Sequence, residues 1–280
     1  MTIYLAYDGS VNGDWIAPYA VQAARHRPTP RLRVVHVENA EISGKALAEK
    51  FDTIRHIAGN AHVDVDFSII PMRHGVFGGL IEKLPEGVDT AVICGLRVRG
   101  GRRGFLAGTV SEQLLRHQKY TVVALRVVQP GLLGVVRRLL LPVAGHRPGT
   151  AAAHVLLELL VPTLSDVRLL HVVRVSGRRF RRLSAAQAGA LRHDAAPRMD
   201  ILERDIAAGI DLGGTHLDIA VRVSDNWASE ALIEAAHMRA DLIALEASTQ
   251  TLATPMKFGD PVEKILRNTP CDAAIYRGPR

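Results

Sequence analysis

The chain has 280 residues, of which 48% are hydrophobic and 22% are charged, and its net charge is +7. Its apolar runs are far shorter than the roughly 20 residues that cross a bilayer, so a transmembrane protein is excluded and no membrane insertion is expected. Two cysteines are too few for a disulfide scaffold, and the N-terminus lacks the pattern of a secretion signal, so we expect a cytoplasmic protein.

Short β-branched runs alternate with amphipathic segments along the chain, which predicts alternating strands and helices. In the first half, the expected strands lie at residues 2–7, 31–37, 62–70, 90–95 and 121–128. In the second half, they lie at residues 139–145, 166–175, 217–223, 242–247 and 273–277. Strands that alternate with helices predict a parallel sheet. We therefore expect an α/β protein with two flavodoxin-like, open, five-stranded parallel sheets, each with helices on both faces.

The two halves also match in detail, which indicates an internal duplication. LAYDGS at residues 5–10 corresponds to LPVAGH at residues 141–146. Between the halves, the segment around Gly134 interrupts both strand and helix patterns. We place the boundary there, which predicts domains at residues 1–133 and 134–280.

The segment at residues 95–112 follows the fourth expected strand and is rich in glycine and arginine. Open parallel sheets bind ligands at the carboxyl edge where the strand order reverses, so this loop would lie at such an edge. A loop that enters a helix at Gly108 points backbone N–H groups and the positive helix end at one spot, which favours phosphate. Thr109 adds a hydroxyl that can donate to phosphate or cap the helix.

These features resemble the universal stress protein family, as a tandem of two repeats that covers nearly the whole chain. The first strand ends in an aspartate and a small turn at residues 8–10, and the second ends in a His-Val pair at residues 36–37, as in that family. Nucleotide-binding members then carry glycine, two residues, glycine, nine residues, glycine, and Ser or Thr. Gly95 and Gly108 keep their places in this pattern, whereas Val98 stands where the second glycine belongs.

The resemblance implies a site in the first half for ATP or a related adenine nucleotide, with or without Mg²⁺. In the family, the ends of the first two strands flank the adenosine, and the glycine loop with the following helix lines the phosphates. The implied site residues are Ala6, Tyr7, Asp8, Val37, Gly95, Arg97, Gly108, Thr109, Val110 and Ser111.

Val98 is the departure that leaves two alternatives open. A β-branched residue disfavours positive φ and crowds a ligand that needs close backbone approach. Gly100 and Gly101 lie close enough in sequence to compensate. The loop therefore either binds nucleotide or keeps the family shape without a ligand.

The second half departs further from the pattern. Its counterparts of the aspartate, the two glycines and the hydroxyl residue are Ala144, Glu246, Thr249 and Asp260. Two carboxylates in the place of the phosphates repel an anionic ligand. We expect no nucleotide in this degenerate site.

The segment GIDLGGTHLDIAV at residues 209–221 is similar to the phosphate-binding hairpin of sugar kinases. That hairpin normally opens its fold, whereas here too little chain follows it for a kinase. The glycine pair at residues 213–214 is better explained as the end of a helix and the start of a strand.

Metal ligation and catalysis are not expected from the residue patterns. The 12 histidines do not stand at ligand spacing with cysteine or carboxylate. Ser10 and Ser111 lack a neighbouring base and orienting group, so helix caps or phosphate donors explain them better than nucleophiles do. We expect no enzyme, with at most slow, incidental ATP hydrolysis.

Nucleic-acid binding is not expected either, although the net charge would permit it. Aromatic residues make up 5% of the chain, and the basic runs at residues 97–104 and 176–183 lack a series of interleaved aromatics to stack bases.

Two main functions therefore remain open, and a third alternative is an enzyme that acts on a phosphorylated small molecule at the same sheet edge. The first is a stress-response regulator whose partner is an adenine nucleotide. The second is a ligand-free scaffold of the same fold that docks on a partner protein such as a transporter. The resemblance also implies that the fifth strands, at residues 121–128 and 273–277, pair within the chain as a pseudo-dimer; whether two chains form a homodimer stays open.

Overall fold

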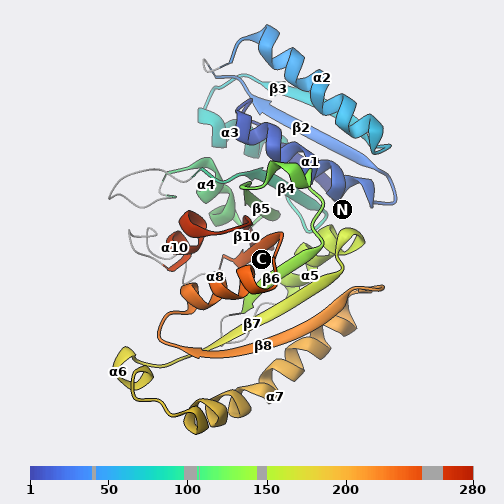
Figure 1. The fold of residues 1–280 in the computed structure, drawn as a ribbon. Coiled ribbons are helices and arrows are strands. Elements are labelled where there is room, and N and C mark those ends of the chain that lie inside the picture. The colour runs from blue at the N-terminus through green and yellow to red at the C-terminus, as the bar shows by residue number, and fades with distance from the viewer. Residues whose placement is uncertain (40–41, 98–105, 107, 144–149, 248–260, 280) are drawn as a thin grey trace. The chain divides into compact units, whose positions relative to one another are not determined.

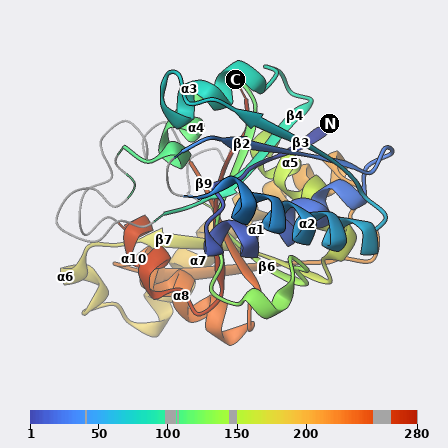
Figure 2. The same cartoon turned by 90° about the horizontal axis from the view of Figure 1, so that it is seen from above.

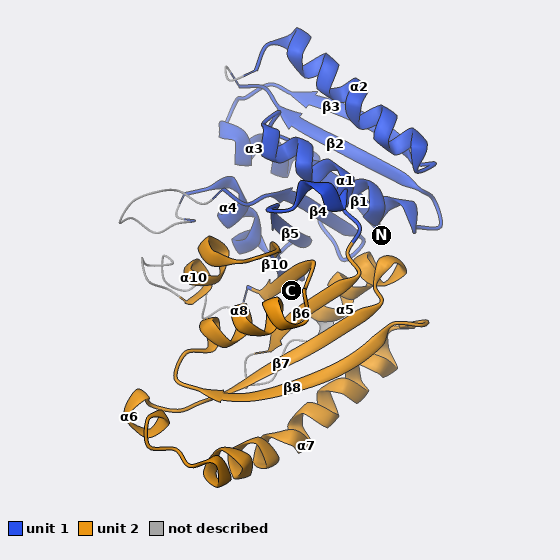
Figure 3. Cartoon of the chain, viewed as in Figure 1, with its two compact units in different colours: residues 1–135, 247–256, 274–280 blue, residues 136–246, 257–273 orange. Residues whose placement is uncertain are grey.

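The computed structural model describes the chain apart from residues 40–41, 98–105, 107, 144–149, 248–260 and 280. The chain forms two compact units (Figure 3). Unit 1 contains Met1–Val135, Ala247–Met256 and Ala274–Arg280, and unit 2 contains Val136–Glu246 and Lys257–Ala273. The chain passes from unit 1 to unit 2 beside Gly134, and unit 1 also takes residues from the end of the chain.

Strands and helices alternate through unit 1 (Figure 1). Its elements are β1 (Thr2–Ala6), α1 (Val11–Arg25), β2 (Arg31–Val37), α2 (Gly44–Asn60), β3 (Asp64–Ile70), α3 (Gly75–Lys83), β4 (Thr90–Gly95), α4 (Val110–His117), β5 (Thr121–Arg126) and the 3-10 helix η1 (Pro130–Leu132).

The sheet of unit 1 is parallel, with the strand order β3-β2-β1-β4-β5. Residues 90–94 of β4 are all buried, which explains why the sequence TAVIC is continuously apolar rather than alternating. Helix α1 packs beside α2, and α3 packs beside α4. Figure 2 shows α1 and α2 on one side of β2 and β3 and α3 on the other. Helices therefore cover both faces of this sheet.

Unit 2 repeats the same order of elements. They are β6 (Arg138–Val143), α5 (Thr150–Leu160), the 3-10 helix η2 (Val161–Thr163), β7 (Asp166–Arg174), α6 (Gly177–Phe180), α7 (Ala185–Gly209), β8 (His216–Ser224), α8 (Trp227–His237), β9 (Leu242–Glu246) and α10 (Pro261–Asn268). The last strand, β10 (Asp272–Arg277), begins in unit 2, and its residues from Ala274 onward belong to unit 1. The strand order β9-β6-β7-β8 is again parallel and corresponds to β4-β1-β2-β3 of unit 1. Both units are α/β folds with open parallel sheets, as the sequence predicts.

Several helices begin where a hydroxyl side chain binds a free N–H of the first turn. The Ser10 hydroxyl accepts the N–H of Gly13 at 3.1 Å and starts α1. Ser184 starts α7 in the same way and forms a reciprocal capping box with Gln187. These caps explain why the helices start where the hydroxyl residues stand in the sequence.

The segment that ends unit 1 is packed rather than loose. Gly134 has a φ of +77°, and a Cβ atom there would lie 2.6 Å from the main chain of both Pro18 and Tyr19 in α1. The segment around Gly134, which interrupts the secondary-structure pattern, therefore packs closely against α1.

Candidate functional site

The candidate site lies where the strand order of unit 1 changes direction, between β1 and β4. Open α/β sheets bind ligands at the carboxyl ends of such strands. Ala6 pairs in register with Cys94 at this edge. Tyr7 and Asp8 continue from β1, and Gly95 ends β4. The fold thus brings these predicted site residues to one edge of the sheet.

The first two residues after β1 have different surroundings. Tyr7 is buried, and its hydroxyl donates a hydrogen bond to Asp14, which also pairs with Lys50. Burial, and then the bond to Asp14, raise the pKa of Tyr7 well above its usual range. Asp8 is exposed; its Oδ1 accepts the N–H of Ser10 at 2.9 Å and the Ser10 hydroxyl at 2.6 Å. Tyr7 therefore packs in the core, whereas Asp8 stabilises the turn at residues 8–10 through hydrogen bonds to its Oδ1.

Val37 ends β2 on the neighbouring strand, and its side chain faces α3. A Cβ atom on Gly79 would lie 3.1 Å from Val37 Cγ2, so the glycine makes room for the valine. Only 3% of Val37 is exposed. Its side chain is enclosed by protein, which leaves its main chain as the part that a ligand could reach.

Gly95 and Asn12 meet at the carboxyl edge of the unit 1 sheet. A Cβ atom on Gly95 would lie 3.0 Å from Asn12 Nδ2 and 3.3 Å from Ile16 Cδ1. The Asn12 amide makes no hydrogen bond within the described part of the chain. Asn12 was not predicted from the sequence, where its only signal is its place in the first turn of the helix after the aspartate turn. It adds an amide donor and acceptor to the candidate site.

Arg97 is exposed and is the last described residue before the loop at residues 98–105. Val98, Gly100 and Gly101 fall in that loop and lie outside the described residues. The effect of Val98 on the site therefore stays a prediction.

The first turn of α4 holds the remaining predicted residues. Gly108 has a φ of +71° and open space around a Cβ atom built there, so glycine is needed for the backbone conformation rather than for room. The Thr109 hydroxyl donates to Leu106 O at 2.7 Å and accepts the Glu112 N–H at 3.2 Å, which makes it a helix cap. Within the residues described, the N–H groups of Val110 and Ser111 have no hydrogen-bond partner.

A carboxylate also lies at this helix end. Glu112 Oε2 accepts the Gly108 N–H at 2.7 Å, and its Oε1 accepts from Arg116 Nε at 3.0 Å and Nη2 at 2.9 Å. Only 7% of Glu112 is exposed. Its sequence signals are an acidic residue in a first helical turn and a basic residue four positions later. Glu112 therefore binds the Gly108 N–H, which is one of the N–H groups predicted to bind phosphate.

Cys94 lies next to Gly95 and is buried in β4. Burial, and then the charge of Asp8, raise its pKa to about 12, and burial raises that of Cys271 to about 11. Because the thiolate is the reactive form, we expect neither cysteine to react with iodoacetamide in the folded protein at pH 8. Mass spectrometry should find no adduct before denaturation in urea and two after it. Rapid labelling of the folded protein would contradict this burial.

The corresponding edge of unit 2 is described only in part. Glu246 ends β9 and is half-buried. Ala144, Thr249 and Asp260 lie outside the described residues. The expectation of a degenerate second site therefore stays a prediction.

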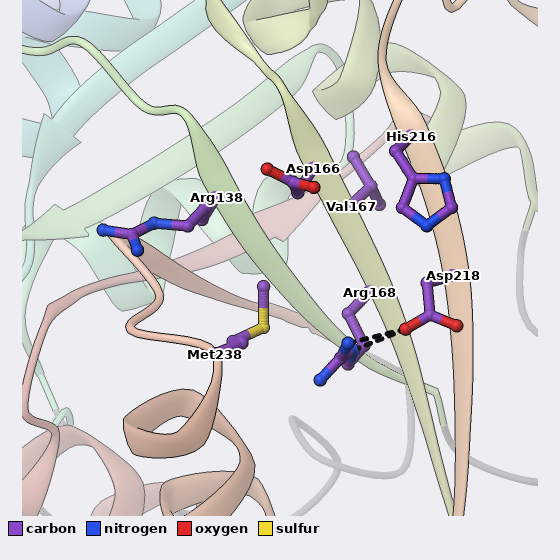
Figure 4. Close-up of a pocket in the computed structure, with 7 residues that line it drawn as sticks. All are labelled: Arg138, Asp166, Val167, Arg168, His216, Asp218 and Met238. Atoms are coloured by element: carbon purple, nitrogen blue, oxygen red, sulfur yellow. Dashed lines mark hydrogen bonds and ion pairs between the residues drawn. The ribbon is translucent and has the colours of Figure 1, made fainter.

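A hollow of about 220 Å³ lies in unit 2, at the amino ends of β6, β7 and β8 (Figure 4). It is lined by Arg138, Asp166, Val167, Arg168, His216, Asp218 and Met238. Arg168 is paired with Asp218 and Glu234, and Arg138 with Asp241. Both arginines of the hollow are thus already paired with carboxylates, so the hollow offers an anionic ligand no uncompensated positive charge from them.

Neither a metal-binding cluster nor a membrane-spanning helix is found among the described residues. These contain no cluster of three or more His, Cys, Asp or Glu side chains that could hold a metal ion. None of the helices described is both long and apolar enough to cross a membrane.

Comparison with known proteins gives the family. The sequence profile of the universal stress protein family matches residues 136–277, whereas no curated protein matches the sequence. One similar solved structure is a universal stress protein from Archaeoglobus fulgidus, with a TM-score of 0.60 and 14% identity; the match covers 98% of this chain and 97% of that one. Another is a functionally unknown protein from Pseudomonas aeruginosa, with a TM-score of 0.58 and 13% identity; the match covers 98% of this chain and 91% of that one.

A third similar structure is the cytoplasmic domain of a prokaryotic cation chloride cotransporter, with a TM-score of 0.56, 11% identity and coverage of 99% and 95%. Identities this low show a shared fold alone. The family profile, by contrast, matches half of the chain, and its range includes all the strands of unit 2. The chain belongs to the universal stress protein family.

Proposed function

We propose that this protein is a cytoplasmic stress-response regulator that binds ATP or a related adenine nucleotide in unit 1 and is not primarily an enzyme. The observation that carries the proposal is the start of α4, where Gly108 turns the chain and the N–H groups of Val110 and Ser111 have no partner among the described residues. Unpaired N–H groups at a helix N-terminus favour phosphate oxygens.

Two further groups at the carboxyl edge of the sheet, on Asp8 and Asn12, could form hydrogen bonds with the ribose or the phosphates of a nucleotide. Asp8 Oδ2 makes no hydrogen bond within the described part of the chain, so it can accept from a ribose hydroxyl. The Asn12 amide over Gly95 can donate to a ribose or phosphate oxygen. Mg²⁺, if it is present, would be held mainly by the phosphates.

Val110→Pro tests the proposal because it deletes one of the free N–H groups. Proline is favoured at the first position of a helix, and Thr109, with φ −81° and ψ 154°, already has the backbone conformation required before proline. We expect ATP affinity in isothermal titration calorimetry to fall about tenfold or more, because a hydrogen bond to a charged group contributes about 1.5–3 kcal/mol. The melting temperature without ligand should hardly change.

Ala185→Pro is the matched control, because Ala185 is the first residue of α7 in unit 2 and follows Ser184 with φ −74° and ψ 159°. This variant should bind ATP like the wild type. Mass spectrometry of small molecules released from freshly purified protein identifies the natural ligand. A wild type that neither releases a nucleotide nor binds added ATP, ADP or AMP would contradict the proposal.

One observation favours the second candidate, a ligand-free scaffold. Glu112 already binds the Gly108 N–H, and a carboxylate there opposes an incoming phosphate. The fold is also shared with the cytoplasmic domain of a cotransporter. If Glu112 closes the site, Glu112→Gln should bind ATP more tightly than the wild type does. If both proteins fail to bind, the scaffold is the better explanation.

A further inference from the structure

The connection between β7 and α7 in unit 2 carries a cluster of arginines. We call residues 174–182 the basic segment; it includes α6, which Figure 1 shows beyond the ends of β7 and β8. Its arginines are all exposed: Arg174, Arg178, Arg179, Arg181 and Arg182. The segment contains no acidic residue. Five of the 35 Lys and Arg residues of the chain therefore lie in one short connection.

The charges of the basic segment are not compensated by any described residue. Within the described residues, none of its five arginine side chains forms an ion pair or a hydrogen bond with a carboxylate. Arg168 and Arg222, on the strands nearby, are both paired with Glu234. Asp225 lies against Gly177, where a Cβ atom would be 2.9 Å from its Oδ2, yet it pairs with none of the five arginines. The basic segment is thus free to bind an external anion.

The backbone of the basic segment is ordered by local hydrogen bonds. The Ser176 hydroxyl accepts the Arg179 N–H at 3.3 Å, and Ser176 O accepts the Phe180 N–H at 2.8 Å. Arg181 and Arg182 donate their N–H groups to Gly177 O and Arg179 O at 3.2 and 3.0 Å. Because the turn is formed in advance, binding would order the arginine side chains but not the main chain.

An aromatic ring stands in the middle of these charges. Phe180 is 38% exposed, with two arginines directly before it and two directly after it. Leu183, three residues later, is half-buried. A short turn with one exposed aromatic residue among basic residues suits a lipid interface, where the ring enters the headgroup region and the arginines meet the lipid phosphates. Binding of a nucleic acid strand would instead favour several aromatic residues along a track.

We propose that the basic segment binds the surface of membranes rich in anionic phospholipids, so that the protein associates with them peripherally and reversibly. Each arginine close to such a surface strengthens binding by about fivefold, and Phe180 adds apolar contact. The interaction should weaken as salt increases, because exposed charges are screened over about 10 Å at 0.1 M ionic strength. This proposal does not depend on nucleotide binding in unit 1.

Sedimentation of the full-length protein with lipid vesicles tests the proposal. Phosphatidylcholine vesicles containing about a third phosphatidylserine should carry down the wild type at low salt, whereas pure phosphatidylcholine vesicles should not. The test variant replaces four arginines of the segment with glutamine: Arg178→Gln, Arg179→Gln, Arg181→Gln and Arg182→Gln. We expect its partition coefficient to fall at least 30-fold. Phe180→Ser should lower it about threefold to tenfold, because only part of the ring is available to lipid.

The control variant removes the same number of charges elsewhere in unit 2. It replaces four other exposed arginines with glutamine: Arg192→Gln, Arg198→Gln, Arg204→Gln and Arg239→Gln. If the basic segment is the binding site, this variant should keep most of the affinity. Equal loss in both variants would show that only the net charge matters and would overturn the proposal. Binding of a labelled single-stranded oligonucleotide that depends on the same four arginines, without binding to vesicles, would also overturn it.

Discussion

Gly134→Ala is expected to destabilise unit 1 by about 3–4 kcal/mol. An alanine at a φ of +77° is strained by about 1–2 kcal/mol, and overpacking typically costs a further 1–3 kcal/mol. The overlap here cannot be relieved by a side-chain rotation, because the new Cβ would lie 2.6–2.7 Å from main-chain atoms of Pro18 and Tyr19. The chain must shift away from α1, which loosens the end of unit 1.

Urea unfolding measures this effect in each unit separately. The chain has two tryptophans, Trp15 in unit 1 and Trp227 in unit 2, so a Trp227→Phe background reports on unit 1 alone. Gly131→Ala is the matched control, because its Cβ would meet nothing within 4 Å and should change stability by less than about 0.5 kcal/mol. Similar midpoints for both variants would show that Gly134 is not held against α1.

Glu234→Gln is expected to destabilise unit 2 by about 2 kcal/mol. Glu234 is 1% exposed, and its two oxygens accept from Arg168 Nη1 and Arg222 Nη2, both at 2.7 Å. Breaking a fully buried ion pair costs about 3–5 kcal/mol. The cost is smaller here because both arginines are partly exposed and glutamine keeps one oxygen acceptor.

The control variant for Glu234→Gln changes Glu230, which lies one turn earlier on α8. Glu230 is half-buried and makes no ion pair within the described part of the chain, so Glu230→Gln should change stability by less than about 1 kcal/mol. Urea unfolding in a Trp15→Phe background follows unit 2 through Trp227. If Glu234→Gln matched Glu230→Gln, the bridge between β7, β8 and α8 would contribute nothing to stability.

The candidate site was predicted in part from local sequence. The residues that end β1, β2 and β4 stand directly after apolar runs, and parallel strands bring their carboxyl ends to one edge. Gly108 and Thr109 were recognisable because a left-handed residue followed by a capping hydroxyl is a local feature. Asn12 and Glu112 were not found, because their roles depend on which backbone atoms the fold places beside them.

The sequence by itself determined the alternation of strands and helices and the family, because these follow from periodic burial and from spacing along the chain. Only the tertiary structure decided which N–H groups at α4 have no partner in the described part of the chain, that Gly134 packs against α1, and that Glu234 joins two arginines. The physical reason is that each of these contacts joins main-chain or side-chain atoms whose relative positions are set by packing, and packing involves residues distant in the chain.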